Sequence, residues 1–108
     1  MKIGVCIGID DLADFEKQIA EFPKEGFTTC QLLAWNPKIR TPENAEKIKK
    51  LLAEYNVTPS AYWAGWEGPG VWDFYDGPKT LGLVPPEYRE MRVKNLCDGA
   101  DVAKLLGI

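Results

Sequence analysis

The chain begins with a regular alternation of bulky and small side chains. Four aliphatic residues occupy the odd positions of residues 2–9, and small residues separate them, namely Gly4, Cys6 and Gly8. Because successive side chains of a strand point to opposite faces, this period of two predicts a strand with one bulky face and one nearly bare face.

A helical period follows this strand. Apolar side chains recur at helical spacing at Leu12, Phe15, Ile19 and Phe22. Asp10 or Asp11 precedes them as an N-cap, and Gly26 follows them as a left-handed stop. The pattern predicts one helix between these signals.

The same alternation of strand and helix then repeats. Residues 27–35 are β-branched and aromatic enough for a second strand. Thr41 as N-cap and Pro42 at the first helical position begin a second helix. Its apolar stripe consists of Ala45, Ile48, Leu52 and Tyr55.

A third unit is expected to follow that helix. Asn56 can close the helix, and residues 57–65 predict a third strand, although Pro59 lacks the N–H that a sheet ladder uses. A helix is expected from about Glu87 to Leu106, with Gly107 as its stop and Ile108 as the first residue of a fourth strand. The predicted buried face of this helix is Val93, Leu96, Cys97, Ala100 and Ala103.

Strands that alternate with helices predict an α/β fold with a parallel sheet and right-handed crossovers. The exception to the pattern is the stretch WAGWEGPGVWDFYDGP, residues 63–78. Its glycines and prolines exclude a continuous helix or strand, yet it is crowded with aromatic side chains. Since a buried loop leaves backbone polar groups without partners, routine core filling does not explain this stretch.

Composition and charge narrow the functional classes. The net charge is −3, which gives no basic surface for nucleic acid or an anionic membrane, and no signal peptide or membrane span is visible. We therefore expect a cytoplasmic protein. The chain has no histidine, which excludes imidazole-based triads and His-ligated zinc within it. Cys6, Cys30 and Cys97 are too scattered for a disulfide framework and are expected to be reduced and mostly buried.

Three stretches resemble a known family, the sugar phosphate isomerases/epimerases of the xylose isomerase-like TIM barrels. They are MKIGVCIG at the start, the aromatic stretch, and LGLVPPEYREMRVKNLCDGADVAKLLGI, residues 81–108. The resemblance implies that residues 1–108 form the first three βα units of an eight-stranded barrel of about 250 residues. In that family a divalent metal (Mn, Mg, Zn or Co) is held mostly by the second half of the barrel, so this chain alone is expected to bind none.

The resemblance also gives the aromatic stretch a role. Loops after the strands line the catalytic face of such a barrel. Trp35, Trp63 and Trp66 could form a wall for the apolar face of a sugar ring, while Glu67 could accept its hydroxyls or act as a base. Packing of the loop itself, and a solvated carboxylate, are the plainer alternatives. Trp72, Phe74 and Tyr75 are expected to serve packing or a subunit contact.

Other polar residues leave alternatives open. Gln31 and Tyr62 could reach a ligand or face the helices. Arg89 and Arg92, one helical turn apart, could bind a phosphate, although pairing with a nearby acid is the commoner outcome.

The function expected from the resemblance is part of a metal-dependent isomerase or epimerase, which transfers a proton next to the carbonyl of a sugar or sugar phosphate. We expect the chain to be inactive alone, and to associate with itself or with the missing C-terminal part of the barrel through its open sheet edges. The alternative is a non-catalytic half-barrel that binds carbohydrate or self-assembles. Catalytic residues cannot be assigned.

Overall fold

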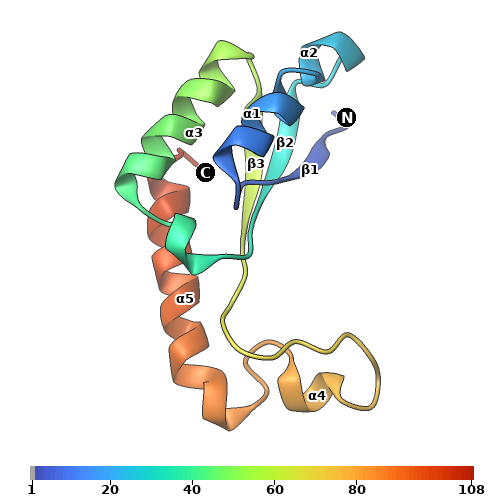
Figure 1. The fold of residues 1–108 in the computed structure, drawn as a ribbon, viewed down its shortest axis with the longest axis vertical. Coiled ribbons are helices and arrows are strands. Elements are labelled where there is room, and N and C mark those ends of the chain that lie inside the picture. The colour runs from blue at the N-terminus through green and yellow to red at the C-terminus, as the bar shows by residue number, and fades with distance from the viewer. Residues whose placement is uncertain (1) are drawn as a thin grey trace.

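Three parallel strands form the centre of the structure, a computed structural model that describes residues 2–108. They are β1 (Val5–Gly8), β2 (Thr29–Ala34) and β3 (Thr58–Ala64), hydrogen-bonded in that order (Figure 1). Both neighbouring pairs run parallel, so the expected parallel α/β arrangement is confirmed. Pro59 is tolerated because β3 is an edge strand and its register with β2 shifts between Cys30 and Gln31.

Helices connect the strands and begin at the expected caps. The side chain of Asp11 accepts hydrogen bonds from the amides of Ala13 and Asp14, and that of Thr41 accepts one from the amide of Asn44. The helices are α1 (Leu12–Ile19), α2 (Phe22–Glu25), the 3-10 helix η1 (Pro37–Ile39), α3 (Pro42–Glu54), α4 (Gly77–Thr80) and α5 (Pro86–Leu105).

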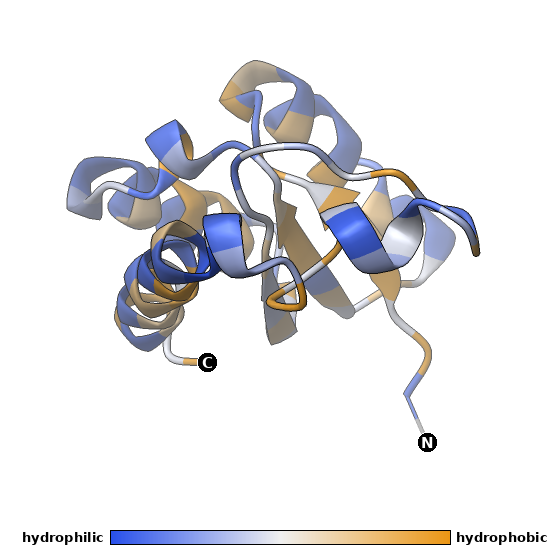
Figure 2. Cartoon of the chain, turned by 90° about the horizontal axis from the view of Figure 1, so that it is seen from below, coloured by the Kyte–Doolittle hydropathy of each residue, from blue (hydrophilic) through white to orange (hydrophobic). Residues whose placement is uncertain are grey.

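The core lies between the helices and one face of the sheet. In Figure 2 the strands are mostly hydrophobic, whereas the long helices alternate hydrophilic and hydrophobic residues. The predicted bulky face of β1 is buried at Ile7 and Ile9, while Cys6 and Gly8 on the other face are exposed. The remaining strand and helix residues of the core include Phe15, Ile19, Leu32, Ala45, Ile48 and Leu52.

The first predicted helix is in fact two helices. α1 ends at Ile19, and α2 begins at Phe22 after a short turn. Pro23 explains the break, because proline has no N–H and its ring clashes with the carbonyl four residues earlier, which is that of Ile19. Gly26 still ends the segment with a left-handed φ of 81°.

The predicted buried face of α5 is wrong. Val93 and Leu96 are 43% and 40% exposed, and Cys97 is exposed as well. The face that packs on β3 and α3 instead consists of Arg92, Asn95, Gly99 and Val102. The prediction failed because it counted apolar residues, whereas this face is built from two hydrogen-bonded polar side chains and a glycine.

Two smaller expectations also need correction. All three cysteines are free, but only Cys30 is buried. Ile108 starts no strand in the described structure, since its amide donates back to the carbonyl of Ala103 at the end of α5. No helix among residues 2–108 combines the length and the apolar composition needed to cross a bilayer.

Candidate functional site

Four tryptophans gather where β2 and β3 end. Trp35 follows β2 directly, Trp63 is the last but one residue of β3, and Trp66 and Trp72 belong to the loop that follows β3. The ring centroids of Trp35 and Trp63 are 4.0 Å apart, and those of Trp35 and Trp66 are 5.7 Å apart. Trp72 joins them at 6.4 Å from Trp35 and 6.2 Å from Trp66. We call these four residues the tryptophan cluster.

The tryptophan cluster is open to solvent on one side. Trp35 is 43% exposed and Trp72 is 67% exposed, whereas Trp63 and Trp66 are half-buried. The Trp35 ring meets the rings of Trp63, Trp66 and Trp72 edge to face. Indole rings that contact one another in this way and still face water offer an apolar surface with N–H donors at its edges. Such a surface fits a ligand that has both an apolar face and polar groups.

The structure brings together three of the four residues predicted to bind substrate, and adds Trp72, which was expected to serve packing or a subunit contact. Glu67 follows the cluster but is exposed, so the indole rings do not enclose its carboxylate. Only its backbone is hydrogen-bonded in the described structure: its amide donates to the side chain of Asn95, and its carbonyl accepts from Arg92. Phe74 and Tyr75 lie outside the cluster at the exposed tip of the loop, as Figure 1 shows for the segment around α4.

The carboxylate of Asp10, which the sequence indicates only as a possible helix cap, joins the ends of β1 and β2. Asp10 accepts hydrogen bonds from the amides of Trp35 and Asn36, at 3.2 and 2.9 Å, while Asp11 caps α1. Asp10 therefore fixes the backbone that carries Trp35. No sequence signal separates Asp10 from Asp11, since either fits the cap position.

Arg40, which the sequence did not single out, links the carboxyl ends of β2 and β3 to α5. Its guanidinium donates to the carbonyl of Ala34, the last residue of β2, and to that of Gly65, the residue after β3. It also donates to the carbonyl of Asn95 in α5, at 2.9 Å. The hydroxyl of Tyr62 is buried close by on the helix side of the sheet, and this burial raises the pKa of Tyr62. Tyr62 therefore faces the helices rather than a ligand.

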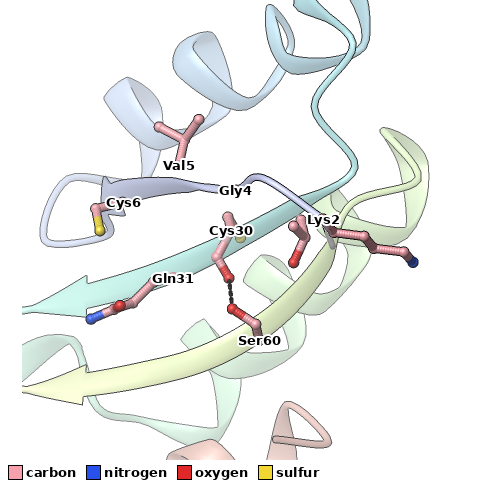
Figure 3. Close-up of a pocket in the computed structure, with 8 residues that line it drawn as sticks. Lys2, Gly4, Val5, Cys6, Cys30, Gln31 and Ser60 are labelled. Carbon is pink, nitrogen blue, oxygen red and sulfur yellow. Dashed lines mark hydrogen bonds between the residues drawn. The ribbon is translucent and has the colours of Figure 1, made fainter.

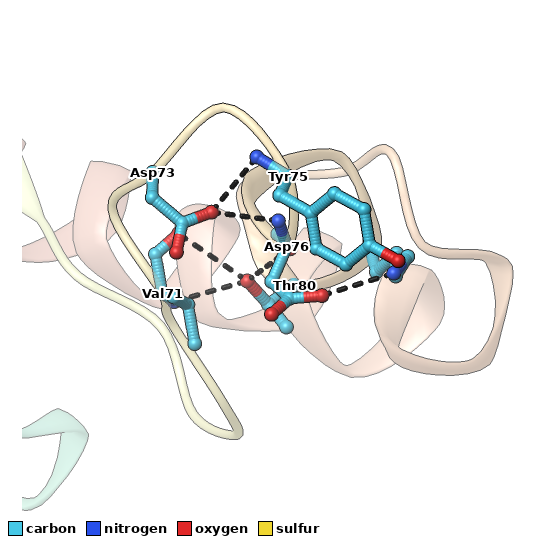
Figure 4. Close-up of polar contacts among 6 residues, drawn as sticks. Val71, Asp73, Tyr75, Asp76 and Thr80 are labelled. Atoms are coloured by element: carbon cyan, nitrogen blue, oxygen red, sulfur yellow. Dashed lines mark hydrogen bonds and ion pairs between the residues drawn. The ribbon is translucent and has the colours of Figure 1, made fainter.

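The loop between β3 and α5 has its own hydrogen bonds, shown in Figure 4. Asp73 accepts from the amides of Tyr75 and Asp76, and these bonds, that of Asp76 first, lower the pKa of Asp73. Thr80 accepts from the amide of Val71 at 2.9 Å and donates to the carbonyl of Asp76 at 3.0 Å. These contacts give the loop a defined shape although it contains only the short α4.

The two arginines considered as phosphate ligands bind this loop instead. Arg89 donates to the carbonyls of Leu83 and Val84, and Arg92 donates to four other loop carbonyls. Among residues 2–108 neither forms an ion pair, so the expected pairing with an acid is also wrong. A sequence does not reveal this arrangement because backbone carbonyls carry no residue identity.

A hollow lies on the open face of the sheet, nearer the start of the strands than the tryptophan cluster. Figure 3 shows Cys6, Gln31 and Ser60 around it, with Ser60 donating to the carbonyl of Cys30 at 3.0 Å. Gln31 thus points away from the helices, which settles the alternative left open for it. The lining mixes polar residues such as Thr29 with apolar ones such as Val5, and includes no aromatic side chain.

The described residues do not fit a divalent metal. Among residues 2–108 no group of three or more Cys, Asp or Glu side chains lies close enough together to hold an ion. We therefore derive no metal-dependent step for this chain.

The comparisons with known proteins concern the fold. No model of a protein family matches the chain, and no curated protein matches it. The structure is similar to the crystal structure of a xylose isomerase domain protein from Planctomyces limnophilus, with a TM-score of 0.82 and 26% sequence identity. The match covers 97% of this chain and 36% of that one. The resemblance to xylose isomerase-like barrels is therefore confirmed, and the three βα units have the fold of part of a TIM barrel.

Proposed function

We propose that this chain, which has the fold of the N-terminal portion of a xylose isomerase-like barrel, holds a sugar or sugar phosphate for an isomerase or epimerase. The observation that carries this proposal is the tryptophan cluster at the carboxyl ends of β2 and β3. In TIM barrels this is the edge where substrates are bound.

The cluster suits a sugar for chemical reasons. One face of a sugar ring is rich in C–H groups and stacks on indole, while the hydroxyls at its rim need hydrogen-bond partners. Trp35 and Trp72 present the most exposed ring surface. The carboxylate of Glu67, the residue after Trp66, is exposed and can accept hydrogen bonds from hydroxyls. The role of this chain is to orient the substrate.

The chemistry itself would come from other residues. Proton transfer next to a carbonyl in this kind of enzyme uses a divalent metal (Mn, Mg, Zn or Co) to polarise the oxygen. Because the described residues hold no such group, we propose that catalysis requires the remaining strands of a barrel. The uncovered edges of β1 and β3 support association with such a C-terminal part, or with a second copy, through strand pairing. The three free thiols support a reducing, cytoplasmic location.

A non-catalytic carbohydrate-binding half-barrel is the second candidate. The exposed rings of Trp35 and Trp72 favour it, because stacking on indole can hold a sugar without further chemistry. Turnover distinguishes the two: the enzyme proposal requires metal-dependent interconversion of an aldose and a ketose, or of epimers, once the rest of a barrel is supplied.

Intrinsic tryptophan fluorescence tests the binding that both candidates share. We expect saturable changes when the chain is titrated with aldoses, ketoses and their phosphates. Trp72→Ala should weaken binding about 2- to 12-fold, since an aromatic contact contributes about 0.5–1.5 kcal/mol beyond its buried area. Phe74→Ala is the matched control, because Phe74 is exposed at the tip of the same loop but outside the cluster. Equal effects of both substitutions, or no saturation with any sugar, would contradict the proposal.

A further inference from the structure

We propose that Arg92 is the positioning residue of the tryptophan cluster. From α5 it ties both limbs of the loop of residues 65–85 to one point, so that Trp66 and Trp72 are held in place before a ligand arrives. The binding half of this inference rests on the proposed function, whereas its structural half does not.

The hydrogen bonds of Arg92 reach both limbs of the loop. On the outgoing limb, its Nε donates to the carbonyl of Glu67 at 3.2 Å and its Nη2 to that of Pro69 at 2.7 Å. On the returning limb, its Nη1 donates to the carbonyls of Thr80 and Gly82, both at 2.7 Å. One guanidinium thus joins backbone segments that are more than ten residues apart in sequence.

Burial makes this arrangement specific. Arg92 is fully buried, and a guanidinium does not lose its proton in proteins. A buried charge is stable only when its donors are satisfied, and here the carbonyl oxygens of the loop satisfy them. A loop conformation that withdrew these carbonyls would leave the cation unpaired, so the charge disfavours alternative conformations of the loop.

Arg92 also contacts the cluster directly. Its Cζ lies 5.4 Å from the centroid of the Trp66 ring and 4.9 Å from that of Tyr88. Trp66 in turn contacts the rings of Trp35, Trp63 and Trp72. The guanidinium therefore supports a ring that contacts all three other tryptophans of the cluster.

The next turn of α5 reinforces the same point of the loop. Asn95 accepts from the amide of Glu67 at 3.0 Å, while Arg92 binds the carbonyl of that residue. Gly68 follows with a left-handed φ of 91°, and a Cβ there would lie 3.4 Å from Nη2 of Arg92. Both backbone polar groups of Glu67, its amide and its carbonyl, are thus bound by side chains of α5.

A tryptophan cluster that is already ordered binds a ligand more tightly than a mobile one, because no conformational entropy is lost in ordering it on binding. This predicts that changing Arg92 weakens sugar binding without removing any group that touches the sugar. It also predicts that the loop of the unliganded chain is ordered and does not close as a lid.

The test compares Arg92→Met and Arg92→Lys with a variant that is destabilised elsewhere. Leu52→Ala is the matched control, since Leu52 is buried in α3 away from the loop. All measurements are made at a temperature at which every variant is folded by far-ultraviolet circular dichroism. The readouts are the near-ultraviolet circular dichroism of the indoles, the rate of trypsin cleavage after Lys79 in the loop, and the dissociation constant for a sugar.

We expect Arg92→Met to lose most of the near-ultraviolet signal, to be cleaved after Lys79 at least about tenfold faster, and to bind sugar about tenfold more weakly, as for a contact worth about 1.4 kcal/mol. The ammonium of Arg92→Lys cannot span both limbs of the loop, so its indole signal, cleavage rate and sugar affinity should lie between those of the wild type and of Arg92→Met. Leu52→Ala should leave the indole signal and the cleavage rate unchanged.

Two outcomes overturn the inference: wild-type indole signal and cleavage rate in Arg92→Met, or equal changes in Leu52→Ala. If Arg92→Met does not fold, Arg92→Lys decides by the same criteria. If the unmodified chain binds no sugar, the proposed function fails, but the indole signal and the cleavage rate still decide whether Arg92 positions the cluster.

Discussion

Gly65 lies against Trp35 with no room for a side chain between them. A Cβ at Gly65 would stand 2.7 Å from both Cα and Cε3 of Trp35, closer than real Cβ contacts come. The amide of Gly65 donates to the carbonyl of Ala34 at 2.8 Å in the same contact. This close approach of the residues that follow β2 and β3 brings the rings of Trp35 and Trp63 to their short separation.

Substitution of Gly65 by alanine should therefore disturb the cluster. The added methyl group overlaps the backbone as well as the ring of Trp35, so the neighbour cannot yield by a rotamer change alone. We expect the free energy of unfolding to fall by about 1–3 kcal/mol, as in other overpacked sites. Chemical denaturation measures this loss. Gly8→Ala is the control, because a Cβ at Gly8 meets nothing within 4 Å; an equal loss in both variants would contradict the argument.

A second glycine sets the packing of α5 on the sheet. A Cβ at Gly99 would overlap the Cβ of Ala64 in β3, and the ring of Tyr62 lies next to it. Gly99→Ala gains helix propensity, but the overlap should outweigh that gain of about 1 kcal/mol and destabilise the chain by about 1–3 kcal/mol net. Thermal unfolding checks the sign. An increase in stability would show that α5 does not approach β3 so closely.

The three thiols should differ in reactivity. Cys30 is buried. Two causes raise the pKa of its thiol to about 11: this burial is the larger one, and the charge of the nearby Cys6 is the smaller one. Since the thiolate is the reactive form, Cys30 should stay unreactive at pH 9, while the exposed Cys6 and Cys97 react. Labelling with a disulfide reagent, followed by mass spectrometry of the peptides, should show two fast thiols and a third that reacts only after unfolding. Cys30→Ala should abolish the slow phase alone.

The shape of the loop tip should depend on the ionisation of Asp73. Hydrogen bonds from the amide of Asp76 and then from that of Tyr75 lower the pKa of Asp73 below its ordinary value of 3.8. A lowered pKa in the folded state means that the carboxylate favours the folded loop. This contribution is complete above the ordinary value and is lost as the pH falls through the lowered one.

Nuclear magnetic resonance can follow this transition. The amide signals of Tyr75 and Asp76 should titrate together with a midpoint below 3.8. Asp73→Ala should remove the transition, whereas Asp101→Ala, a change on the exposed side of α5, should leave it in place. A midpoint at or above the ordinary value would show that the carboxylate does not hold these amides.

The sequence predicts the elements of this fold well where a local signal decides them. Thr41 and Asp11 cap their helices as their residue types indicate, and Asn56 leaves α3 with a left-handed φ of 54°, as a helix-closing asparagine can. The alternation in β1 assigns its faces correctly because period two is a direct consequence of strand geometry. Pro23 is a further local signal, since it accounts for the break between α1 and α2.

The site was predictable only in part. The position of Trp35, Trp63 and Trp66 at or just after the carboxyl ends of parallel strands is enough to bring them together, because these ends share one edge of the sheet. The residues that support them, Arg40 and Arg92, were not predictable, since both bind backbone carbonyls that come from distant parts of the chain. Arg92 also lies on the face of α5 that hydropathy assigns to solvent.

The loop of residues 65–85 is tied near its base, and its outermost side chains contribute little to the folded core. Phe74 and Tyr75 are almost completely exposed, beyond the carbonyls that α5 holds. Substitutions at these two positions should therefore change the side chains that the loop offers to a ligand, with little loss in the free energy of unfolding. The loop therefore has a base that is fixed by hydrogen bonds and a tip whose side chains are scarcely packed, which makes the tip a place where selectivity can be changed by mutation or by design.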